Sequence, residues 1–312
     1  MTVQNNQLPP GTPLSHYRIS NTLSAGGFGI VYLAQDQRSN QTVVIKEYLP
    51  NKLATREANL NVVPRADECI STLNEGRQLF LLEVSALKKL THPNIVHITD
   101  SFDAFNTVYI VMDYRPGENL QNIITQCSGG LGETAIRTIF PPLIDGLRVV
   151  HANNLLHLDI KPGNILIQQD GNPILLDFGA VIRKNMSRTL QPRPVITPGF
   201  SPVEQHDPKG YCGPWTDIYA IAATIRTCME GSPPPKATDR QEKDKMKPAT
   251  VAFKRKYSPS LLEAIDWAME VDALLRPQSI EEFMEAFNKA GGPEAGGFFS
   301  GLIKRWSLGK AG

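Results

Sequence analysis

The sequence predicts an α+β protein with two lobes, and two observations lead to this prediction. Between Tyr17 and Tyr114 the chain is dominated by short apolar stretches rich in β-branched and aromatic residues. From there to about residue 290 it is dominated by longer segments with helical periodicity. A strand-rich half followed by a helix-rich half is typical of α+β architecture. We therefore expect a small antiparallel sheet with one helix in the first lobe and a larger, mostly helical second lobe.

The expected sheet of the first lobe consists of stretches bounded by Gly, Asn and Asp, which favour turns. These stretches cover residues 17–23, 30–36, 42–49, 94–103 and 107–114. One helix is expected at 77–90, with Glu83 at the edge of its apolar face. Helical spacing of three or four residues defines that face, and the residues that form it are Phe80, Val84, Leu87 and Leu90.

The second lobe has four recognisable segments. Apolar residues at helical spacing predict a helix over 133–154, which Pro141 and Pro142 should kink or divide. Residues 216–230 are apolar almost all round, which predicts a buried central helix. The Pro-rich, charged stretch 231–249 is expected to be a surface loop. A last helix should begin near Ser279, which has Glu282 at capping-box spacing.

The domain boundaries follow from these changes in composition. Residues 1–15 are polar and Pro-rich, and we expect them to form a flexible lead-in. The first lobe should cover 16–114, with an insertion at about 52–74, and the second lobe 115–290. Residues 291–312 combine a Gly-rich linker with apolar residues at helical spacing, which indicates an amphipathic tail. That tail would pack on its own domain, meet a partner or lead toward a further region.

Composition excludes several classes of protein. Lys and Arg number 32 against 31 for Asp and Glu, and a net charge of +1 offers no extended field for nucleic acid. The chain contains no run of 18 apolar residues, so we expect no membrane span, and its polar N-terminus does not resemble a signal peptide. Four cysteines without C-x-x-C spacing indicate free thiols. Together these features favour a cytoplasmic protein.

The most informative stretch of the chain runs from His157 to Gly179 and contains the segments HLDIKPGN and LLDFG. Asp159 lies in a polar loop, and Asp177 follows an apolar strand 18 residues later (177 − 159). Phosphoryl transfer from a metal-bound nucleoside triphosphate needs one carboxylate to accept a hydroxyl proton and another to hold metal. Two carboxylates in this arrangement therefore suggest a phosphotransferase.

These segments resemble the catalytic core of the eukaryotic-like protein kinases. They match the pattern H-R-D-x-x-x-x-N followed by D-F-G at every position except Leu158. The loop D-I-K-P-G-N has the serine/threonine form, and the resemblance is strongest to bacterial members. It implies the bilobal protein kinase fold, with the active site in the cleft between the lobes. The implied cofactors are ATP and Mg²⁺, with Mn²⁺ as an alternative metal, and the implied partners are proteins with Ser or Thr acceptors.

The resemblance also implies roles for single residues. Asp159 would orient and deprotonate the acceptor hydroxyl, and Lys161 would neutralise charge on the phosphoryl group. Asn164 would join Asp177 in binding the metal. Thr197 lies where a serine/threonine kinase contacts both the acceptor and the base. His157 is expected to pack in the core and not to act in catalysis.

A second set of residues is implied to bind the nucleotide. LSAGGFGIVY resembles the glycine-rich loop, and Lys46 takes the place of the lysine that grips the α- and β-phosphates. Glu83 is the expected ion-pair partner of Lys46, with Glu75 as another acid in the region. Met112 would guard the back of the adenine pocket, and the following backbone would bind the adenine edge. The full set is Leu23, Ser24, Ala25, Gly26, Gly27, Phe28, Gly29, Val31, Val44, Lys46, Glu83, Met112, Asp113, Tyr114, Arg115, Leu166 and Asp177.

Three more residues are implied to be structural. Glu204 and Arg276 lie where the family has a buried ion pair at the end of the activation segment, which corresponds to residues 177–204 here. Asp217 lies where the family anchors the backbone of the catalytic loop. None of the three is expected to touch the reacting groups.

Leu158 replaces an arginine that binds the phosphorylated activation loop in many relatives. An apolar side chain offers phosphate neither charge nor a donor. We therefore expect activity without phosphorylation of Ser187 or Thr189, with control coming from nucleotide, a partner or the insertion. Two alternatives are an ATP-binding pseudokinase or scaffold of the same fold, and a small-molecule phosphotransferase of the aminoglycoside or choline type.

Overall fold

The computed structural model describes residues 6–127, 130–177, 182–183, 195–207 and 209–289. The chain divides into two compact units. The first unit comprises the chain up to Thr91 together with Val96–Arg115, and the second comprises His92–Ile95 together with the chain from Pro116 onward. The expected tail at 291–312 and Phe178 lie outside the described residues.

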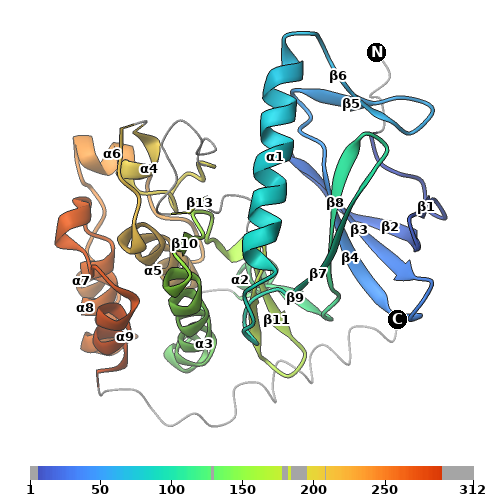
Figure 1. Cartoon of the computed structure of the whole chain (residues 1–312). Helices are drawn as coiled ribbons and strands as arrows, with labels where there is room; N and C mark the ends of the chain where they lie inside the picture. The colour runs from blue at the N-terminus through green and yellow to red at the C-terminus, as the bar shows by residue number, and fades with distance from the viewer. Residues whose placement is uncertain (1–5, 128–129, 178–181, 184–194, 208, 290–312) are drawn as a thin grey trace. The chain divides into compact units, whose positions relative to one another are not determined.

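The first unit is built on an antiparallel sheet, shown in blue and green in Figure 1. Within the described residues its six strands follow the order β1-β2-β3-β4-β8-β7. The strands are β1 (Pro13–Leu14), β2 (Tyr17–Ala25), β3 (Gly29–Asp36), β4 (Thr42–Tyr48), β7 (Ile98–Ala104) and β8 (Thr107–Asp113). All five predicted strand segments are thereby confirmed. A separate hairpin of β5 (Ala54–Arg56) and β6 (Val62–Pro64) follows β4.

Helix α1 (Cys69–Leu87) packs beside this sheet (Figure 1). Its predicted apolar face is confirmed, because Phe80, Val84 and Leu87 are all buried. The helix begins at Cys69, eight residues (77 − 69) before the predicted start at Arg77. Its first turns carry polar residues and the exposed Ile70. They have no apolar stripe from which a helix could be predicted. The expected insertion thus consists of the β5–β6 hairpin followed by the first turns of α1.

The segment predicted as a flexible lead-in is instead packed from residue 6 onward. Leu8 and Leu14 are each 1% exposed and belong to the apolar core of the first unit. The Leu8 backbone N–H donates to the Tyr32 hydroxyl over 3.1 Å, and β1 pairs with β2. The prediction of a flexible segment was wrong because it rested on the polar composition. Burial of two leucines, Leu8 and Leu14, is enough to hold this short segment against the sheet.

The second unit is mainly helical, with strands near its start. Strands β9 (Gly117–Asn119), β11 (Ile165–Gln168) and β12 (Pro173–Leu175) form one small sheet, and β10 (Leu155–Leu156) pairs with β13 (Ile182–Arg183). The helices are α2 (Leu120–Gln126), α3 (Glu133–Ala152), α4 (Val203–His206), α5 (Pro214–Glu230), α6 (Ala237–Glu242), α7 (Ala249–Ala252), α8 (Pro259–Ala268) and α9 (Ile280–Asn288), with 3-10 turns η1 (Pro162–Asn164) and η3 (Ala273–Leu275).

Helix α5 forms the centre of the second unit, as predicted. Nearly all of its residues are buried, and it contacts α3, α8 and α9. Figure 1 shows these helices grouped together, from green α3 through yellow α5 and orange α8 to red α9. Among the described residues, no helix is both long enough and apolar enough for a membrane span.

Three details of the second unit bear on the predictions. Helix α3 is not divided by Pro141 and Pro142, because the apolar face on both sides of them is buried and holds the helix together. The stretch predicted as a surface loop contains α6, where Arg240 is only 7% exposed. The predicted cap of α9 is confirmed, since the Ser279 hydroxyl accepts from the Glu282 backbone N–H.

Candidate active site

The second unit gathers three predicted residues around the carboxylate of Asp159. Lys161 Nζ lies 2.9 and 2.8 Å from its two oxygens. The Thr197 hydroxyl donates to Oδ1 over 2.7 Å, and Asn164 Nδ2 donates to Oδ2 over 3.0 Å. The Asp159 side chain is 10% exposed, so these donors surround most of it. The carboxylate is therefore held in one orientation by Thr197, 38 positions away in the chain, as well as by its near neighbours Lys161 and Asn164.

This arrangement is suited to general-base chemistry. A carboxylate that accepts a hydrogen bond from one hydroxyl can accept from an incoming hydroxyl in the same way, which is the geometry needed to remove its proton. The Thr197–Asp159 hydrogen bond shows that a hydroxyl reaches this oxygen at 2.7 Å. Lys161 Nζ also lies 3.3 Å from the Thr197 hydroxyl. The ammonium group is therefore next to the hydroxyl that binds the Asp159 carboxylate.

The predicted metal ligands, Asn164 and Asp177, lie on adjoining backbone. The Leu176 N–H donates to the Asn164 carbonyl over 2.8 Å, which brings the residue before Asp177 against the catalytic loop. The Asn164 side-chain nitrogen bonds the Asp159 carbonyl and carboxylate, which leaves its oxygen as the atom available to a cation. Asp177 is exposed and has a positive φ of 51°, a conformation that aspartate tolerates better than most residues.

These two residues suit Mg²⁺ in the chemistry of their donors. One carboxylate and one amide oxygen are hard ligands, and Mg²⁺ commonly takes only one or two protein oxygens and completes its shell with water and phosphate. Among the described residues, no group of three or more His, Cys, Asp or Glu gathers as a metal cage.

Asp217, at the start of α5, binds the backbone of the catalytic loop, residues 157–164. Its carboxylate accepts from the backbone N–H groups of His157 and Leu158 over 2.9 and 2.8 Å, and from His151 Nε2 over 2.8 Å. Burial alone would raise the pKa of Asp217, but the bond from His151 and the neighbouring N–H groups hold that pKa below its ordinary value. Asp217 therefore stays ionised inside the protein and fixes the loop.

His157 is a core residue, as predicted. It is fully buried, and burial lowers its pKa, so the imidazole is neutral. Its Nδ1 accepts from the Asp159 N–H over 3.2 Å, which leaves Nε2 to donate to the Leu176 carbonyl over 3.2 Å. The ring thus joins the loop that carries Asp159 to the strand end that carries Asp177.

Glu204 and Arg276 form the buried ion pair expected for them. Two bonds of 2.7 and 3.2 Å join the guanidinium to the carboxylate, whose oxygen also accepts from the Thr216 hydroxyl over 2.9 Å. The side chains of Arg276 and Glu204 are 0% and 9% exposed. The pair ties α4 to the segment before α9 and has no contact with Asp159 in the described structure.

In the first unit, the predicted glycine-rich loop is the turn between β2 and β3. β2 ends at Ala25, preceded by Leu23 and Ser24, and β3 begins at Gly29. The Gly26 N–H donates to the Gly29 carbonyl over 2.9 Å. Phe28, which follows Gly27 at the tip of the turn, is 65% exposed. A Cβ at Gly29 would come within 2.1 Å of the Glu47 carbonyl oxygen, so glycine is required there.

Lys46 lies on the face of the sheet that carries the other expected nucleotide contacts. In β4 the residues Val43, Ile45 and Glu47 are buried, and Val44 and Lys46 alternate with them on the opposite face. Val31 pairs with Lys46, and Met112 pairs with Val44, so both share that face. The strands therefore bring four predicted residues from three separate segments to one surface.

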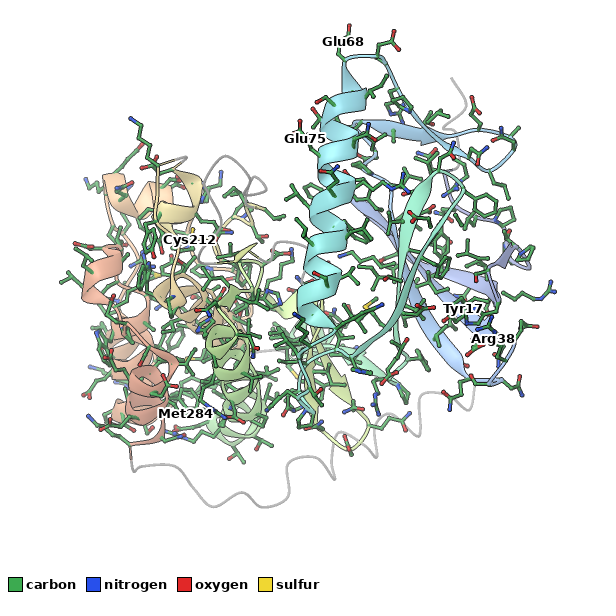
Figure 2. The ribbon with its side chains drawn as sticks, in the orientation of Figure 1. Tyr17, Arg38, Glu68, Glu75, Cys212 and Met284 are labelled. Carbon is green, nitrogen blue, oxygen red and sulfur yellow. The ribbon has the colours of Figure 1, made fainter. Side chains whose placement is uncertain are left out.

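Helix α1 covers the same face. Lys46 Nζ lies 6.0 Å from the centre of the Phe80 ring, and Glu83 follows Phe80 by one helical turn. The side chain of Glu83 lies outside the described part of the structure. Glu75, the other acid considered, is exposed, accepts from the Ser71 hydroxyl over 3.0 Å, and is labelled on α1 in Figure 2.

The remaining nucleotide contacts were predicted for backbone after β8. Asp113 ends β8, and its carboxylate lies 3.3 Å from the Arg115 guanidinium, with Tyr114 exposed between them. Leu166, predicted only as one of the nucleotide contacts, belongs to the second unit, where β11 pairs it with Asn119 and Ile174. Among the activation-loop residues, Ser187 and Thr189 lie outside the described part of the chain.

A buried polar network around Glu47 was not predicted. Its carboxylate is fully buried and accepts two bonds of 2.5 Å from Arg56, one of 2.8 Å from the Tyr32 hydroxyl, and one from the Tyr109 hydroxyl. Arg56 in turn donates to the Asn6 carbonyl over 2.7 Å. The strand that carries Lys46 is thereby joined to the β5–β6 hairpin and to the N-terminal segment. A glutamate at the buried register of a strand was the one sequence signal for this network.

The comparison with known families decides the assignment. Residues 17–287 match the model of the protein kinase domain. The chain belongs to the protein kinase family. The predicted fold and the predicted membership among the eukaryotic-like serine/threonine kinases are therefore confirmed.

Curated relatives of this chain include much longer proteins. The serine/threonine-protein kinase STE20 of Candida glabrata is 30% identical over 289 residues, which cover 89% of this chain and 28% of that protein. STE20 of Saccharomyces cerevisiae is 30% identical over 224 residues, 72% of this chain and 21% of that protein. The chain thus spans about a quarter of the length of these relatives.

Solved structures extend the comparison. The apo form of PpkA-294 is 35% identical, with a TM-score of 0.80, and the match covers 91% of this chain and all of that one. A mutant of the Mycobacterium tuberculosis PknI kinase domain matches with a TM-score of 0.61 at 22% identity, covering 91% of this chain and 98% of that one. At that identity PknI supports the fold alone.

Proposed function

We propose that this protein is a serine/threonine protein kinase that transfers the γ-phosphate of ATP to hydroxyls of protein substrates. The observation that carries the proposal is the carboxylate of Asp159, oriented by Lys161, Asn164 and Thr197 with a hydroxyl at hydrogen-bond distance. A cytoplasmic location belongs to the same proposal, because all four cysteines are free thiols, as suits a reducing compartment.

In the proposed reaction, Asp159 accepts the proton of the Ser or Thr hydroxyl as its oxygen attacks the γ-phosphorus. The bond from that phosphorus to the β,γ-bridging oxygen breaks, and ADP leaves with that oxygen. Lys161 stabilises the negative charge of the group in transfer. In the first unit, Lys46 is proposed to hold the α- and β-phosphates. A Mg²⁺ ion bound by Asn164 and Asp177, or Mn²⁺ in its place, would neutralise phosphate charge.

The first test is catalytic. Purified protein should incorporate labelled phosphate from Mg-ATP into casein as a generic protein acceptor. An ATP-binding scaffold would bind nucleotide without turnover, and a small-molecule phosphotransferase would label an aminoglycoside or choline but not casein. Absence of phosphate transfer to any protein acceptor, including the chain itself, would overturn the proposed function.

Asp177→Asn should abolish metal-dependent nucleotide binding and turnover, since the one carboxylate assigned to the metal is lost. The measurement is titration of Mg-ATP against wild type and variant by calorimetry, alongside the rate of phosphate transfer. Asp207→Asn is a matched control, because Asp207 is an exposed aspartate whose carboxylate accepts only a backbone N–H in the described structure. Unchanged Mg-ATP affinity in Asp177→Asn would contradict the assignment.

We further propose that activity does not depend on phosphorylation of the activation loop. Leu158 is 2% exposed and packs with Leu156 against Val195 and Cys212, the last labelled in Figure 2. An apolar contact of this kind joins the catalytic loop to the end of the activation segment without any charge. The Leu158 side chain itself offers a phosphate neither a hydrogen-bond donor nor a positive charge.

The test of phosphorylation independence compares rates before and after dephosphorylation. Protein treated with phosphatase, and confirmed by mass as unmodified, should show initial rates within about twofold of the untreated protein. The double variant Ser187→Ala, Thr189→Ala should behave in the same way. Negligible activity that returns only when Ser187 or Thr189 is phosphorylated would contradict this proposal.

A further inference from the structure

Gln205 is a buried polar residue that the proposed chemistry does not yet use. It follows Glu204 in α4 and is only 2% exposed. Its side-chain nitrogen donates to the Leu158 carbonyl over 2.7 Å and to the Val195 carbonyl over 2.7 Å. One amide group therefore bonds the catalytic loop and the end of the activation segment at the same time.

The chemistry of this contact allows one orientation of the amide. Both partners are carbonyl oxygens, which only accept hydrogen bonds, so the NH₂ group must face them. An amide nitrogen has two protons, and these two bonds use both. A buried amide that satisfies two separate backbone segments is costly to replace, because each carbonyl would lose its partner inside the protein.

The two carbonyls that Gln205 binds lie next to residues of the candidate active site. Leu158 immediately precedes Asp159 and has a φ of 60°, in the left-handed region that a leucine rarely adopts. Asp217 bonds its N–H, and Gln205 bonds its carbonyl, so polar partners hold both sides of the strained residue. Val195 lies two residues before Thr197, whose hydroxyl bonds Asp159. The two segments bonded by Gln205 are thus the two that supply Asp159 and Thr197.

We propose that Gln205 is a positioning residue for phosphoryl transfer, which sets Asp159 by fixing the backbone of Leu158 against the activation segment. This inference rests on the proposed function. This chain joins the two segments through an uncharged amide and the apolar contact of Leu158. Gln205 acts through Leu158 and Val195 and does not touch the reacting groups.

The test uses the full chain with two substitutions at this position. Gln205→Glu keeps the shape but turns the donor into an acceptor that faces two carbonyl oxygens. Gln205→Met keeps the length and removes the donor without adding charge. Gln278→Glu is the matched control, because the exposed Gln278 amide also donates to two backbone carbonyls, those of Ala273 and Arg276, over 2.9 and 2.8 Å.

The measurements are kcat and KM for casein, the Kd of Mg-ATP, and the thermal midpoint. For Gln205→Glu we expect kcat to fall about 100-fold, as expected for a misplaced reacting group, with the Kd of Mg-ATP within about twofold of wild type. Gln205→Met should lose kcat in the same direction, and Gln278→Glu should match wild type. A folded Gln205→Glu or Gln205→Met with wild-type kcat would overturn the inference, as would an equal loss in Gln278→Glu.

The outcome is also defined if a variant fails to fold. If only Gln205→Glu unfolds, the kcat of Gln205→Met tests the positioning role. If neither variant folds, Gln205 serves stability and the positioning role is wrong. An inactive wild type would overturn the proposed function itself. An active wild type with active Gln205 variants would overturn only the role of Gln205.

Discussion

Asp159→Asn is expected to lower kcat by about 10² to 10⁴-fold, the range usually lost with a general acid or base. Asparagine keeps the shape of the side chain, but its amide cannot take a proton from an attacking hydroxyl. The Kd of Mg-ATP should stay close to wild type, since the base acts only as the hydroxyl attacks and is not assigned to the metal. Steady-state phosphate transfer to casein and calorimetric titration of Mg-ATP measure the two quantities.

The control for this substitution is Asp170→Asn, which makes the same chemical change at an exposed turn residue bonded to the Asn172 N–H. It should leave kcat and Kd unchanged. Turnover of Asp159→Asn at the wild-type rate would contradict the assignment of Asp159 as the general base. A loss of ATP binding in step with kcat would instead point to a part in holding the nucleotide.

Arg276→Met is expected to lower the free energy of unfolding by about 3–5 kcal/mol, the usual cost of removing one partner of a buried ion pair. The substitution leaves Glu204, which is 9% exposed, without its bidentate partner. It also removes the donor to the Glu270 carbonyl at 2.7 Å and the Val271 carbonyl at 2.9 Å. The shift of the urea unfolding midpoint for the second unit measures the loss.

Arg148→Met is the matched control, because the ion pair of Arg148 with Asp145 is 49% and 45% exposed. Exposed pairs contribute roughly 0–1 kcal/mol, so the midpoint should move little. Similar midpoints for Arg276→Met and Arg148→Met would show that the buried pair contributes nothing beyond a surface pair. Because the chain has two units, each transition must be followed by its own probe.

Much of the fold could be predicted from periodicity. The strand segments from residue 17 to 114, the apolar face around Phe80 and the buried helix at 216–230 all appear where predicted. The errors occurred where local pattern is weak. The start of α1 has no apolar stripe, and the N-terminal segment is held by single residues such as Leu8.

The candidate site divides in the same way. Asp159, Lys161 and Asn164 lie within six residues of each other, so their order along the chain is enough to indicate a shared site. The structure adds that Thr197, 38 residues away, bonds the same carboxylate. Glu47 and Gln205 were missed, because a buried polar side chain resembles a surface one until the groups around it are known.

The sequence by itself therefore determined the architecture and indicated the residues proposed for the chemistry, because strand and helix periodicity and the order of residues within one loop are local properties. Tertiary structure alone decided which distant groups satisfy buried charges and carbonyls. Arg56 reaches Glu47, His151 reaches Asp217, and Gln205 reaches both Leu158 and Val195 only after the chain has folded. A buried polar group must find a partner wherever the fold places one, and that place is not encoded in neighbouring residues.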